Sequence, residues 1–415
     1  MQPLRFATAG SVDDGKSTLI GRLLYDARAV QEDQLAAVER ASVRRGGPQL
    51  DLSLLTDGLE AEREQGITID VAYRYFATPG RKFIIADSPG HEQYTRNMAT
   101  GASNADAIVL LVDVEKGLLP QTRRHALIAR LLGIRQAVVF VNKLDRAGYS
   151  AARFHARADE VRAFLEPLRF GSIDVIPGSA LEGDMVVERG ARLGWYAGPT
   201  LLERLETLSS SAEQAAAGPL RFPVQLVSKP ASQPGGDLPR GYMGRVESGH
   251  LLAGTEVMAL PSARRARVRR IVLHGGEREL AVAGDSVTVV LSEDLDIARG
   301  DLIVDALRPP RETRNVEATL VWMDREPLRP AGRYLLQHGP RRIVTRVKAV
   351  KSRVDIHTLA DLPMEGSVGT NDVVAIELSL QSPLFVDPYE AVRTTGAFIL
   401  IDETSNQTVA AGLVR

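Results

Sequence analysis

Gly10-Ser-Val-Asp-Asp-Gly-Lys-Ser17 is the stretch that decides how the chain folds. It lies between an apolar run, Leu4–Thr8, and a helical pattern that extends from Lys16 to about Asp26. In a strand–loop–helix context, the glycines let backbone N–H groups converge on phosphate oxygens, and the helix start adds partial positive charge. The alternative is a glycine-rich turn that matches by accident, and the flanking strand and helix argue against it. The stretch therefore predicts a phosphate-binding loop.

The side chains of this loop predict a nucleotide bound with Mg²⁺. Lys16 is expected to reach the β- and γ-phosphates, which also makes it a catalytic candidate, and the Ser17 hydroxyl is expected to ligate Mg²⁺. The predicted nucleotide-binding residues of this segment are Gly10, Ser11, Val12, Asp13, Asp14, Gly15, Lys16, Ser17 and Thr18. The loop alone does not separate ATPases from GTPases.

A second motif selects the base. Asn142-Lys-Leu-Asp145 follows a predicted buried strand, where an open parallel sheet presents its ligand crevice. A carboxylate that accepts from two adjacent N–H groups of a purine selects guanine, because adenine lacks that paired donor edge. Asp145 suits this role, Asn142 can meet the acceptor edge, and the stem of Lys143 can lie over the ring. The alternative for Asp145 taken alone is a helix cap.

A third motif, Asp87-Ser-Pro-Gly-His91, also follows a predicted buried strand. Asp87 is placed to hold Mg²⁺ through water, and the Gly90 N–H is placed to sense a γ-phosphate. A lone histidine is usually structural. Here its neighbours favour a role for His91 in positioning the attacking water, and hence in catalysis.

Two further loops carry weaker signals. Gly66-Ile-Thr68 lies in a charged stretch, and Thr68 is a candidate second Mg²⁺ ligand and catalytic residue, although a threonine in a loop is commonplace. After the strand that ends near Ile176, the residues Ser179, Ala180 and Leu181 can offer backbone N–H groups to the guanine O6.

The chain as a whole predicts three domains. Strands and helices alternate in the first half, which implies a parallel sheet covered on both faces. After a weakly ordered link, 209–219, only short strands between Gly, Pro and Asp turns follow, with a second break at 307–314. The predicted fold is an α/β P-loop GTPase domain, residues 1–212, followed by two all-β barrel domains, residues 220–308 and 312–415.

Composition narrows the class of protein. The 415 residues are 44% hydrophobic and 25% charged, with a net charge of −1 and no cysteine. A near-neutral chain has no global field for nucleic acid or an anionic membrane. Without cysteine there can be no disulfide or thiolate metal site. No apolar run approaches the length of a bilayer span, and the N-terminus leads directly into the phosphate loop, so a cytoplasmic protein is expected.

Together the motifs resemble the translational-type GTPase family. Their order and approximate spacing are those of the family, and two β-barrels after the GTPase domain look like elongation factor Tu, so the resemblance covers the whole chain. It implies that Thr68 is a Mg²⁺ ligand of a switch segment and that His91 orients the attacking water. It also implies that Val12 and Ile67 form an apolar gate beside that water.

Within this family the chain looks more specifically like the GTPase subunits of bacterial ATP sulfurylase (sulfate adenylyltransferase). The matching stretches are Gly15–Tyr25, Gly66–Phe76, Ala86–Gly101, Arg240–Val246 and Asp296–Asp301. Elongation factors usually carry histidines where this chain has Ser11 and Asp14, and Ser88 stands where the sulfurylase subunits often have threonine.

That resemblance implies GTP and Mg²⁺ as cofactors and a small catalytic subunit as partner, in a heterodimer or a higher assembly. The partner would join sulfate to ATP, giving adenosine 5′-phosphosulfate and pyrophosphate, and GTP hydrolysis would drive this uphill step. Some relatives carry an adenylylsulfate kinase domain, which is not expected here because there is no second phosphate loop.

Two alternatives remain. An elongation factor-like GTPase that binds aminoacyl-tRNA is favoured superficially by the basic runs Arg264–Arg270 and Arg341–Arg353. In strands, however, such runs more often form a solvated face, and no nucleic acid partner is expected. The other alternative is a regulatory GTPase whose nucleotide state controls assembly with a non-enzymatic partner.

Overall fold

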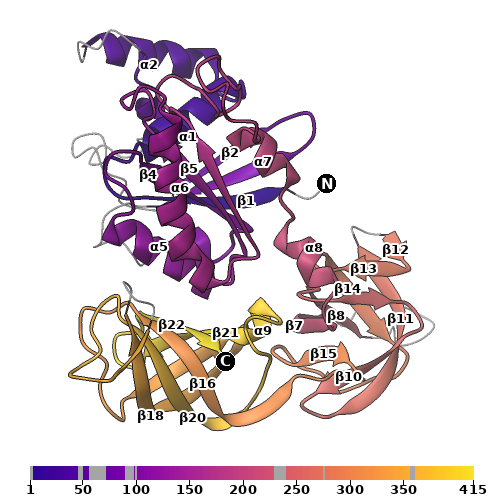
Figure 1. Cartoon of the computed structure of the whole chain (residues 1–415). Coiled ribbons are helices and arrows are strands. Elements are labelled where there is room, and N and C mark those ends of the chain that lie inside the picture. The colour runs from indigo at the N-terminus through magenta and orange to yellow at the C-terminus, as the bar shows by residue number, and fades with distance from the viewer. Residues whose placement is uncertain are drawn as a thin grey trace. The chain divides into compact units, whose positions relative to one another are not determined.

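A computed structural model of the chain describes residues 3–44, 50–55, 72–88, 98, 101–228, 240–273, 276–355 and 360–415. The described residues form two compact units that divide between Ser210 and Ser211. Figure 1 labels their helices and strands where there is room, and each unit is described by itself.

The first unit is built on a six-stranded sheet with the order β2-β3-β1-β4-β5-β6. The strands are β1 (Leu4–Ala9), β2 (Ala72–Ala77), β3 (Lys82–Asp87), β4 (Ala107–Asp113), β5 (Gln136–Asn142) and β6 (Ser172–Pro177). All neighbours are parallel except β2, which pairs antiparallel with β3 at one edge. The helices are α1 (Lys16–Asp26), α2 (Glu32–Arg44), α5 (Pro120–Leu131), α6 (Ala151–Leu165) and α7 (Leu201–Thr207), with short 3₁₀ turns at Leu52–Leu55 and Glu166–Leu168.

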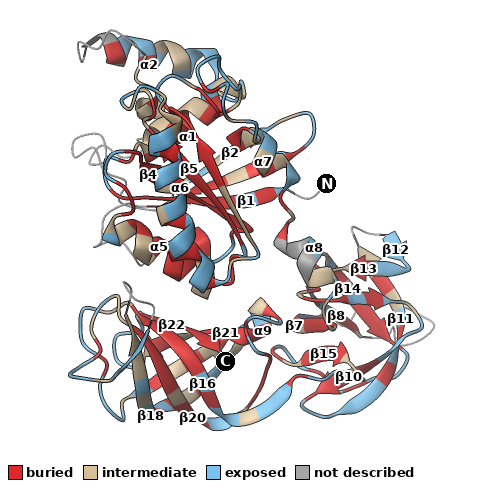
Figure 2. Ribbon diagram, viewed as in Figure 1, coloured by how far each residue is buried: buried red, intermediate tan, exposed pale blue. Residues whose placement is uncertain are grey.

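The centre of this sheet is its most buried part. Every residue of β4 and β5 is buried (Figure 2), as expected for continuous apolar strands in a parallel sheet. α5 packs on β4, and α6 packs on β5 and β6. In register, Thr8 is opposite Asp87 on β1 and β3, and Asp113 is opposite Asn142 on β4 and β5. The strands therefore bring their polar C-terminal residues to one edge of the sheet.

The second unit contains two closed barrels. In the first barrel, the order β10-β15-β7-β8-β14-β11-β12 is closed by an additional pairing of β10 with β11. Its strands are β7 (Arg221–Ser228), β8 (Gly241–Arg245), β10 (Glu256–Leu260), β11 (Arg264–Leu273), β12 (Gly276–Arg278), β14 (Ser286–Leu291) and β15 (Leu302–Asp305), with a separate pair β9 (His250–Leu252) and β13 (Leu280–Val282). Its core is a cluster of fully buried residues that includes Phe222, Val289 and Ile303.

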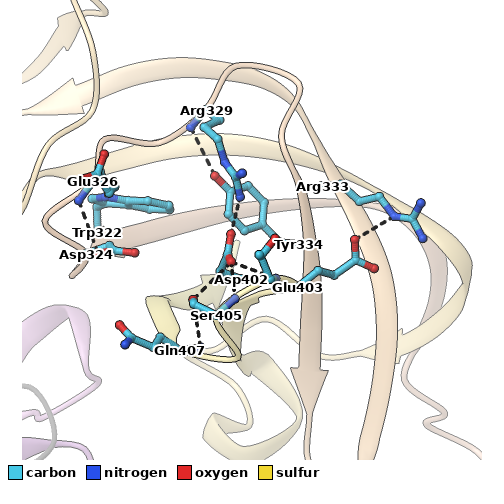
Figure 3. Close-up of polar contacts among 11 residues, drawn as sticks. Trp322, Asp324, Glu326, Arg329, Arg333, Tyr334, Asp402, Glu403, Ser405 and Gln407 are labelled. Atoms are coloured by element: carbon cyan, nitrogen blue, oxygen red, sulfur yellow. Dashed lines mark hydrogen bonds and ion pairs between the residues drawn. The ribbon is translucent and has the colours of Figure 1, made fainter.

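The second barrel has the order β17-β21-β22-β16-β20-β18-β19 and is closed by pairing of β17 with β18. Its elements are β16 (Arg311–Trp322), β17 (Arg333–His338), β18 (Arg341–Val354), β19 (Asp361–Pro363), β20 (Val373–Val386), α9 (Arg393–Gly396), β21 (Ala397–Asp402) and β22 (Thr408–Val414). Figure 3 shows one end of this barrel, where Arg329 pairs with Asp402 and lies 5.5 Å from the ring of Tyr334. Trp322 packs edge-on against the same ring, with centroids 5.9 Å apart.

A buried ion pair joins the two barrels. Arg221, on β7, is 2% exposed and donates through Nε and Nη2 to the two carboxylate oxygens of Asp387, at 2.7 and 2.8 Å. Asp387 also accepts from the Thr395 hydroxyl at 2.5 Å. Beside this pair, Leu260, Leu302 and Val304 of the first barrel pack against Phe385 of the second.

The architecture matches the predicted fold class: an α/β nucleotide-binding unit followed by two all-β barrels. One expectation about the connection is wrong. The link predicted to be weakly ordered contains a short helix, α8 (Ser211–Ala216), and the Ala215 carbonyl accepts hydrogen bonds from Ser248 Oγ and the Gly249 N–H. The three-domain boundaries stay a prediction.

Candidate functional site

The loop between β1 and α1 has the backbone that a phosphate cradle requires. Gly15 has φ = 93° and Asp13 has φ = 68°, both in the left-handed region, so the chain turns sharply just before α1 begins at Lys16. A Cβ on Gly15 would lie 2.5 Å from Asn142 Nδ2. Glycine is therefore required at this position both for its conformation and for the close approach of Asn142.

Asp14 is enclosed within this loop. It is 0% exposed, and its Oδ2 accepts the Ser11 N–H at 2.8 Å, which braces the turn from inside. Its Oδ1 is buried with no partner among the described residues. Burial raises the pKa of Asp14 to about 6, although the hydrogen bond from Ser11 acts in the opposite direction.

Lys16 lies buried at the start of α1 with its ammonium directed at the end of β3. Its Nζ donates to the Ser88 carbonyl and lies 3.6 Å from Asp87 Oδ1. Asp87 is 1% exposed and also accepts from the Thr8 hydroxyl at 3.4 Å. The structure therefore brings the predicted phosphate-binding lysine and the predicted Mg²⁺-linked aspartate together, although 71 residues separate them in sequence (87 − 16).

Asn142 connects three segments of the site. Its Nδ2 donates to the Asp14 carbonyl at 2.8 Å, and its Oδ1 accepts the Ala180 N–H at 2.9 Å. In this structure Asn142 is therefore a brace between the phosphate loop and the loop after β6. Its predicted contact with the acceptor edge of guanine stays a prediction. The carboxamide retains a second N–H and a second lone pair that could make such a contact.

Lys143 follows in a left-handed conformation, with φ = 65°. Its Nζ lies 2.9 Å from Asp113 Oδ2 and donates to the Asp13 carbonyl, so the side chain extends along the phosphate loop. Burial acts to raise the pKa of Asp113, but the hydrogen bonds from Lys143 and from the Glu115 and Lys116 N–H groups outweigh it and leave this pKa below its ordinary value.

Asp145 is half-buried, and its Oδ1 is buried with no hydrogen-bond partner among the described residues. An unpaired buried carboxylate oxygen is costly unless something else supplies the donor. Two adjacent N–H groups on the edge of a guanine would supply donors of the kind that this oxygen lacks. The residues present therefore fit a guanine nucleotide.

Residues 179–181 lie directly beside this motif. Ser179 and Ala180 are 0% and 1% exposed, whereas Leu181 is 47% exposed. The Ser179 hydroxyl accepts the Glu182 N–H at 3.2 Å, which closes a tight turn after β6. The predicted base-contacting loop, residues 179–181, therefore lies next to Asn142.

Ser17 and Thr18 are half-buried in the first turn of α1, and Val12 is 41% exposed at the top of the loop. A serine hydroxyl and a carboxylate are oxygen donors that suit Mg²⁺, so Ser17 and Asp87 fit the predicted metal-binding pair. The remaining predicted residues, Thr68, Gly90, His91 and Ile67, lie outside the described residues, and their roles stay predictions.

Sequence reasoning missed three neighbours of the site. Asp113 carries the same signal as Asp87 and Asn142, a polar residue that ends a buried strand, and could have been found by it. Arg22 on α1 donates to the Ala180 and Leu181 carbonyls. His125 on α5 is fully buried, and burial, followed by the charge of Lys16, lowers its pKa to about 3, so it is neutral at ordinary pH. Nothing in the sequence alone marks these last two contacts.

Some residues of the basic runs in the barrels form ion pairs with acidic residues of other strands in the same sheet. On β18, Lys348 lies 2.6 Å from Glu377 and Lys351 lies 2.8 Å from Glu317. On β11, Arg265 and Arg270 pair with Glu256 and Glu277 at 2.7 and 2.9 Å. These ion pairs neutralise part of the positive charge on the surfaces of both barrels.

Comparison with protein families matches two segments of the chain. Residues 2–212 match the family described as elongation factor Tu GTP binding domain, and residues 315–415 match the family described as GTP-eEF1A C-terminal domain-like. Among the described residues, no helix combines the length and apolar character needed to span a bilayer.

Relatives match over nearly the whole length. Sulfate adenylyltransferase subunit 1 of Aeromonas hydrophila is 48% identical over 413 residues, which cover 99% of this chain and 86% of the relative. Sulfate adenylyltransferase subunit 1 of Vibrio parahaemolyticus is 50% identical over 421 residues, with the same two coverages. The bifunctional enzyme CysN/CysC of Rhodopirellula baltica is 48% identical over 417 residues, which cover 100% of this chain and 63% of that longer protein.

Proposed function

The chain belongs to the sulfate adenylyltransferase subunit 1 family, within the GTPases of the elongation factor Tu type, and from this premise we propose that it is the GTP-hydrolysing subunit of a sulfate adenylyltransferase. In the reaction that it serves, a sulfate oxygen attacks the α-phosphorus of ATP and pyrophosphate leaves, which gives adenosine 5′-phosphosulfate. The sulfate–phosphate anhydride is high in energy, so GTP hydrolysis on this chain supplies the drive.

One observation carries the nucleotide assignment. Asn142 ties the phosphate loop to the loop at Ala180, and three residues later Asp145 presents a buried carboxylate oxygen with no partner among the described residues. A phosphate cradle joined to an unpaired acceptor fits a guanine nucleotide, because guanine supplies adjacent N–H donors.

The residue roles follow from this fit. Lys16 moves from the Ser88 carbonyl to the β- and γ-phosphates, and the backbone N–H groups of residues 10–18 surround them. Ser17 would ligate Mg²⁺ and Asp87 would hold it through water, with Thr68 as the further ligand that the family pattern implies. Mg²⁺ supplies neutralisation of the charge on the β- and γ-phosphates when it is bound.

Hydrolysis is assigned on the sequence pattern. His91 orients the attacking water, and the Gly90 N–H senses the γ-phosphate. Thr68 and Gly90 are ordered by the γ-phosphate and released after hydrolysis, so a partner that binds the two states differently can be driven by the cycle.

We place ATP and sulfate on a small catalytic partner subunit and the assembly in the cytoplasm. The name subunit 1 of the relatives supports a partner chain. The cross-strand pairs such as Lys348–Glu377, which reduce the positive charge that RNA would require, support a protein partner over aminoacyl-tRNA.

The test combines the purified chain with the small subunit, ATP, sulfate and GTP, and follows phosphate release from GTP and adenylylsulfate formation together. We expect GTP hydrolysis to accelerate only in the complete mixture, and the adenylylsulfate yield to exceed the yield without GTP. Hydrolysis that ignores the partner and its substrates, or a yield independent of GTP, would overturn the proposal.

An Asp145→Asn variant is the matched control. It should couple the same reaction to xanthosine triphosphate rather than GTP, which assigns the drive to this site rather than to a contaminating GTPase.

A further inference from the structure

The turn after β6 leaves one backbone donor unused. In residues 179–183, the Ser179 N–H donates to the Asp184 carbonyl, the Ala180 N–H to Asn142, the Glu182 N–H to the Ser179 hydroxyl and the Gly183 N–H to the Ser179 carbonyl. Within the described part of the chain, the Leu181 N–H has no such partner. It is therefore the free donor of the loop that lies next to Asn142.

Arg22 holds the other side of the same peptide groups. From the second turn of α1, its Nε donates to the Ala180 carbonyl at 3.3 Å and its Nη2 donates to the Leu181 carbonyl at 2.6 Å. The stem of Arg22 runs along Gly183, where a Cβ would be in van der Waals contact with Arg22 Cδ, and the φ of 89° at this position favours glycine. The planar guanidinium is suited to gripping two successive carbonyls, which an ammonium cannot do with the same geometry.

This grip fixes the direction of the free donor. The Ala180 carbonyl and the Leu181 N–H belong to one planar trans peptide group, so they point in opposite directions. When Arg22 holds the carbonyl, the Leu181 N–H is held pointing away from the guanidinium. The second contact, to the Leu181 carbonyl, fixes the next peptide group and so prevents the first from rotating.

We propose that Arg22 is a positioning residue for base recognition, which holds the Leu181 N–H as the donor to the 6-oxygen of a guanine nucleotide. The inference rests on the proposed function and deepens it. α1 starts at Lys16, so one helix carries the phosphate lysine and, six residues or roughly 9 Å further on, the anchor of the base loop. The spacing between the phosphate and base subsites is thereby built into a single rigid element.

The test measures the dissociation constants of three nucleotides by competition with a fluorescent GDP derivative. GDP and 6-thio-GDP differ only at the atom that Leu181 would bind, and sulfur is a weak acceptor. GDP and IDP differ only in the 2-amino group, which Asp145 would read. In the unmodified chain we expect both ratios to favour GDP, the 6-oxygen ratio by about tenfold.

Arg22→Met should bring the GDP to 6-thio-GDP ratio close to one and leave the GDP to IDP ratio unchanged. Arg22→Lys, which can hold only one carbonyl, should lower the same ratio by a smaller factor, and it serves as the test if the methionine variant does not fold. The matched control is Asp26→Asn, which removes the negative charge of the partner 3.5 Å from Nη1 and leaves both carbonyl contacts in place, so both ratios should stay as in the unmodified chain.

Three results would overturn the inference while the guanine site itself stands: a GDP to 6-thio-GDP ratio of one in the unmodified chain, an unchanged ratio in both Arg22 variants, or an equal fall in the IDP ratio. A chain that binds ADP as tightly as GDP would instead overturn the proposed function.

Discussion

Lys16 in the phosphate loop and Arg221 between the barrels are both buried cations that face a buried carboxylate, but their surroundings differ. Both oxygens of Asp387 are paired, by Arg221 and Thr395. In the candidate nucleotide site, by contrast, Asp14 Oδ1, Ser88 Oγ and Asp145 Oδ1 are buried without partners among the described residues. Each such atom costs about 1–3 kcal/mol. A site that awaits a ligand bears that cost until the ligand supplies partners, whereas a permanent interface does not.

The largest effect is expected for a substitution in the nucleotide site, which should change the affinity for the nucleotide but not the free energy of unfolding. Asp145→Asn should weaken GDP binding by about 10⁴-fold, about 5.5 kcal/mol, because the amide presents a donor to the donors of guanine. Xanthosine diphosphate, which offers an acceptor there, should bind better. Unfolding of the nucleotide-free chain in urea should change little, since Asp145 Oδ1 has no hydrogen-bond partner among the described residues. Unchanged GDP affinity would show that Asp145 does not read the base.

The interface should respond in the opposite way, through stability alone. Asp387→Ala leaves Arg221 buried and unpaired, so the second unit should lose about 3–5 kcal/mol of unfolding free energy, with GDP affinity unchanged. Trp322 fluorescence in a Trp195→Phe background would report this, because the chain has two tryptophans and Trp322 is 1% exposed in the second barrel.

A double replacement, Arg221→Met with Asp387→Leu, should recover most of that loss, because apolar side chains of similar size can fill a buried ion-pair site. If Asp387→Ala alone changed the free energy of unfolding only slightly, the Arg221–Asp387 ion pair would not stabilise the contact between the barrels.

Asp14 sharpens the comparison through pH. Its pKa is about 6 in the folded chain, against an ordinary value of 3.8, because burial penalises the carboxylate. A raised acid pKa stabilises the folded state most below the unfolded value, and that contribution is lost as the pH rises through about 6. The loss is about 3 kcal/mol for a shift of this size.

The check is urea unfolding of the original chain and of Asp14→Asn from pH 4 to pH 8, followed by Trp195. Relative to the variant, the original chain should lose about 2.5 kcal/mol across this range, because pH 4 lies just above the unfolded pKa. A difference that does not vary with pH would show that Asp14 is not titrating there.

The smallest effect should come from the solvated strand faces. Lys348 is 54% exposed in its pair with Glu377. Glu377→Gln should therefore cost less than about 1 kcal/mol in the second unit, measured with the same Trp322 signal as the Asp387 variants. A loss of unfolding free energy as large as that of Asp387→Ala would remove the distinction between the buried ion pair and the surface ion pair.

The fold could be predicted where burial decides it. The sequence pattern predicts helices at Lys16 to about Asp26 and at Ala151–Leu165 and a strand at Glu256–Leu260, and the structure has these bounds. It also predicts a buried strand at 107–112, and this strand ends one residue later. The edge strand Ala72–Ala77 was missed, because Tyr73 and Tyr75 are exposed and its pairing with β3 is decided by the rest of the sheet. The sequence pattern also predicts a strand at Val268–Leu273, but β11 begins at Arg264, because charged residues at a strand end carry no apolar signal.

For the site, motifs predicted which residues gather but not how they are held. Asp87 and Asn142 stand at strand ends, so parallel pairing brings them to one edge of the sheet. The grip of Arg22 on Leu181 joins residues 159 apart in sequence, and its geometry depends on helix packing that no local pattern encodes. The same is true of the burial that raises the pKa of Asp14.

Arg221 is the first residue of β7, directly after the segment that leads into the barrels, and its side chain is bound to Asp387 of the other barrel. Force applied to the chain ahead of Arg221 would therefore be divided at once, through the backbone into one barrel and through the ion pair into the next. In mechanical terms, tension enters both barrels at Arg221. A pull on the preceding segment would therefore act on the two barrels together rather than on one barrel after the other.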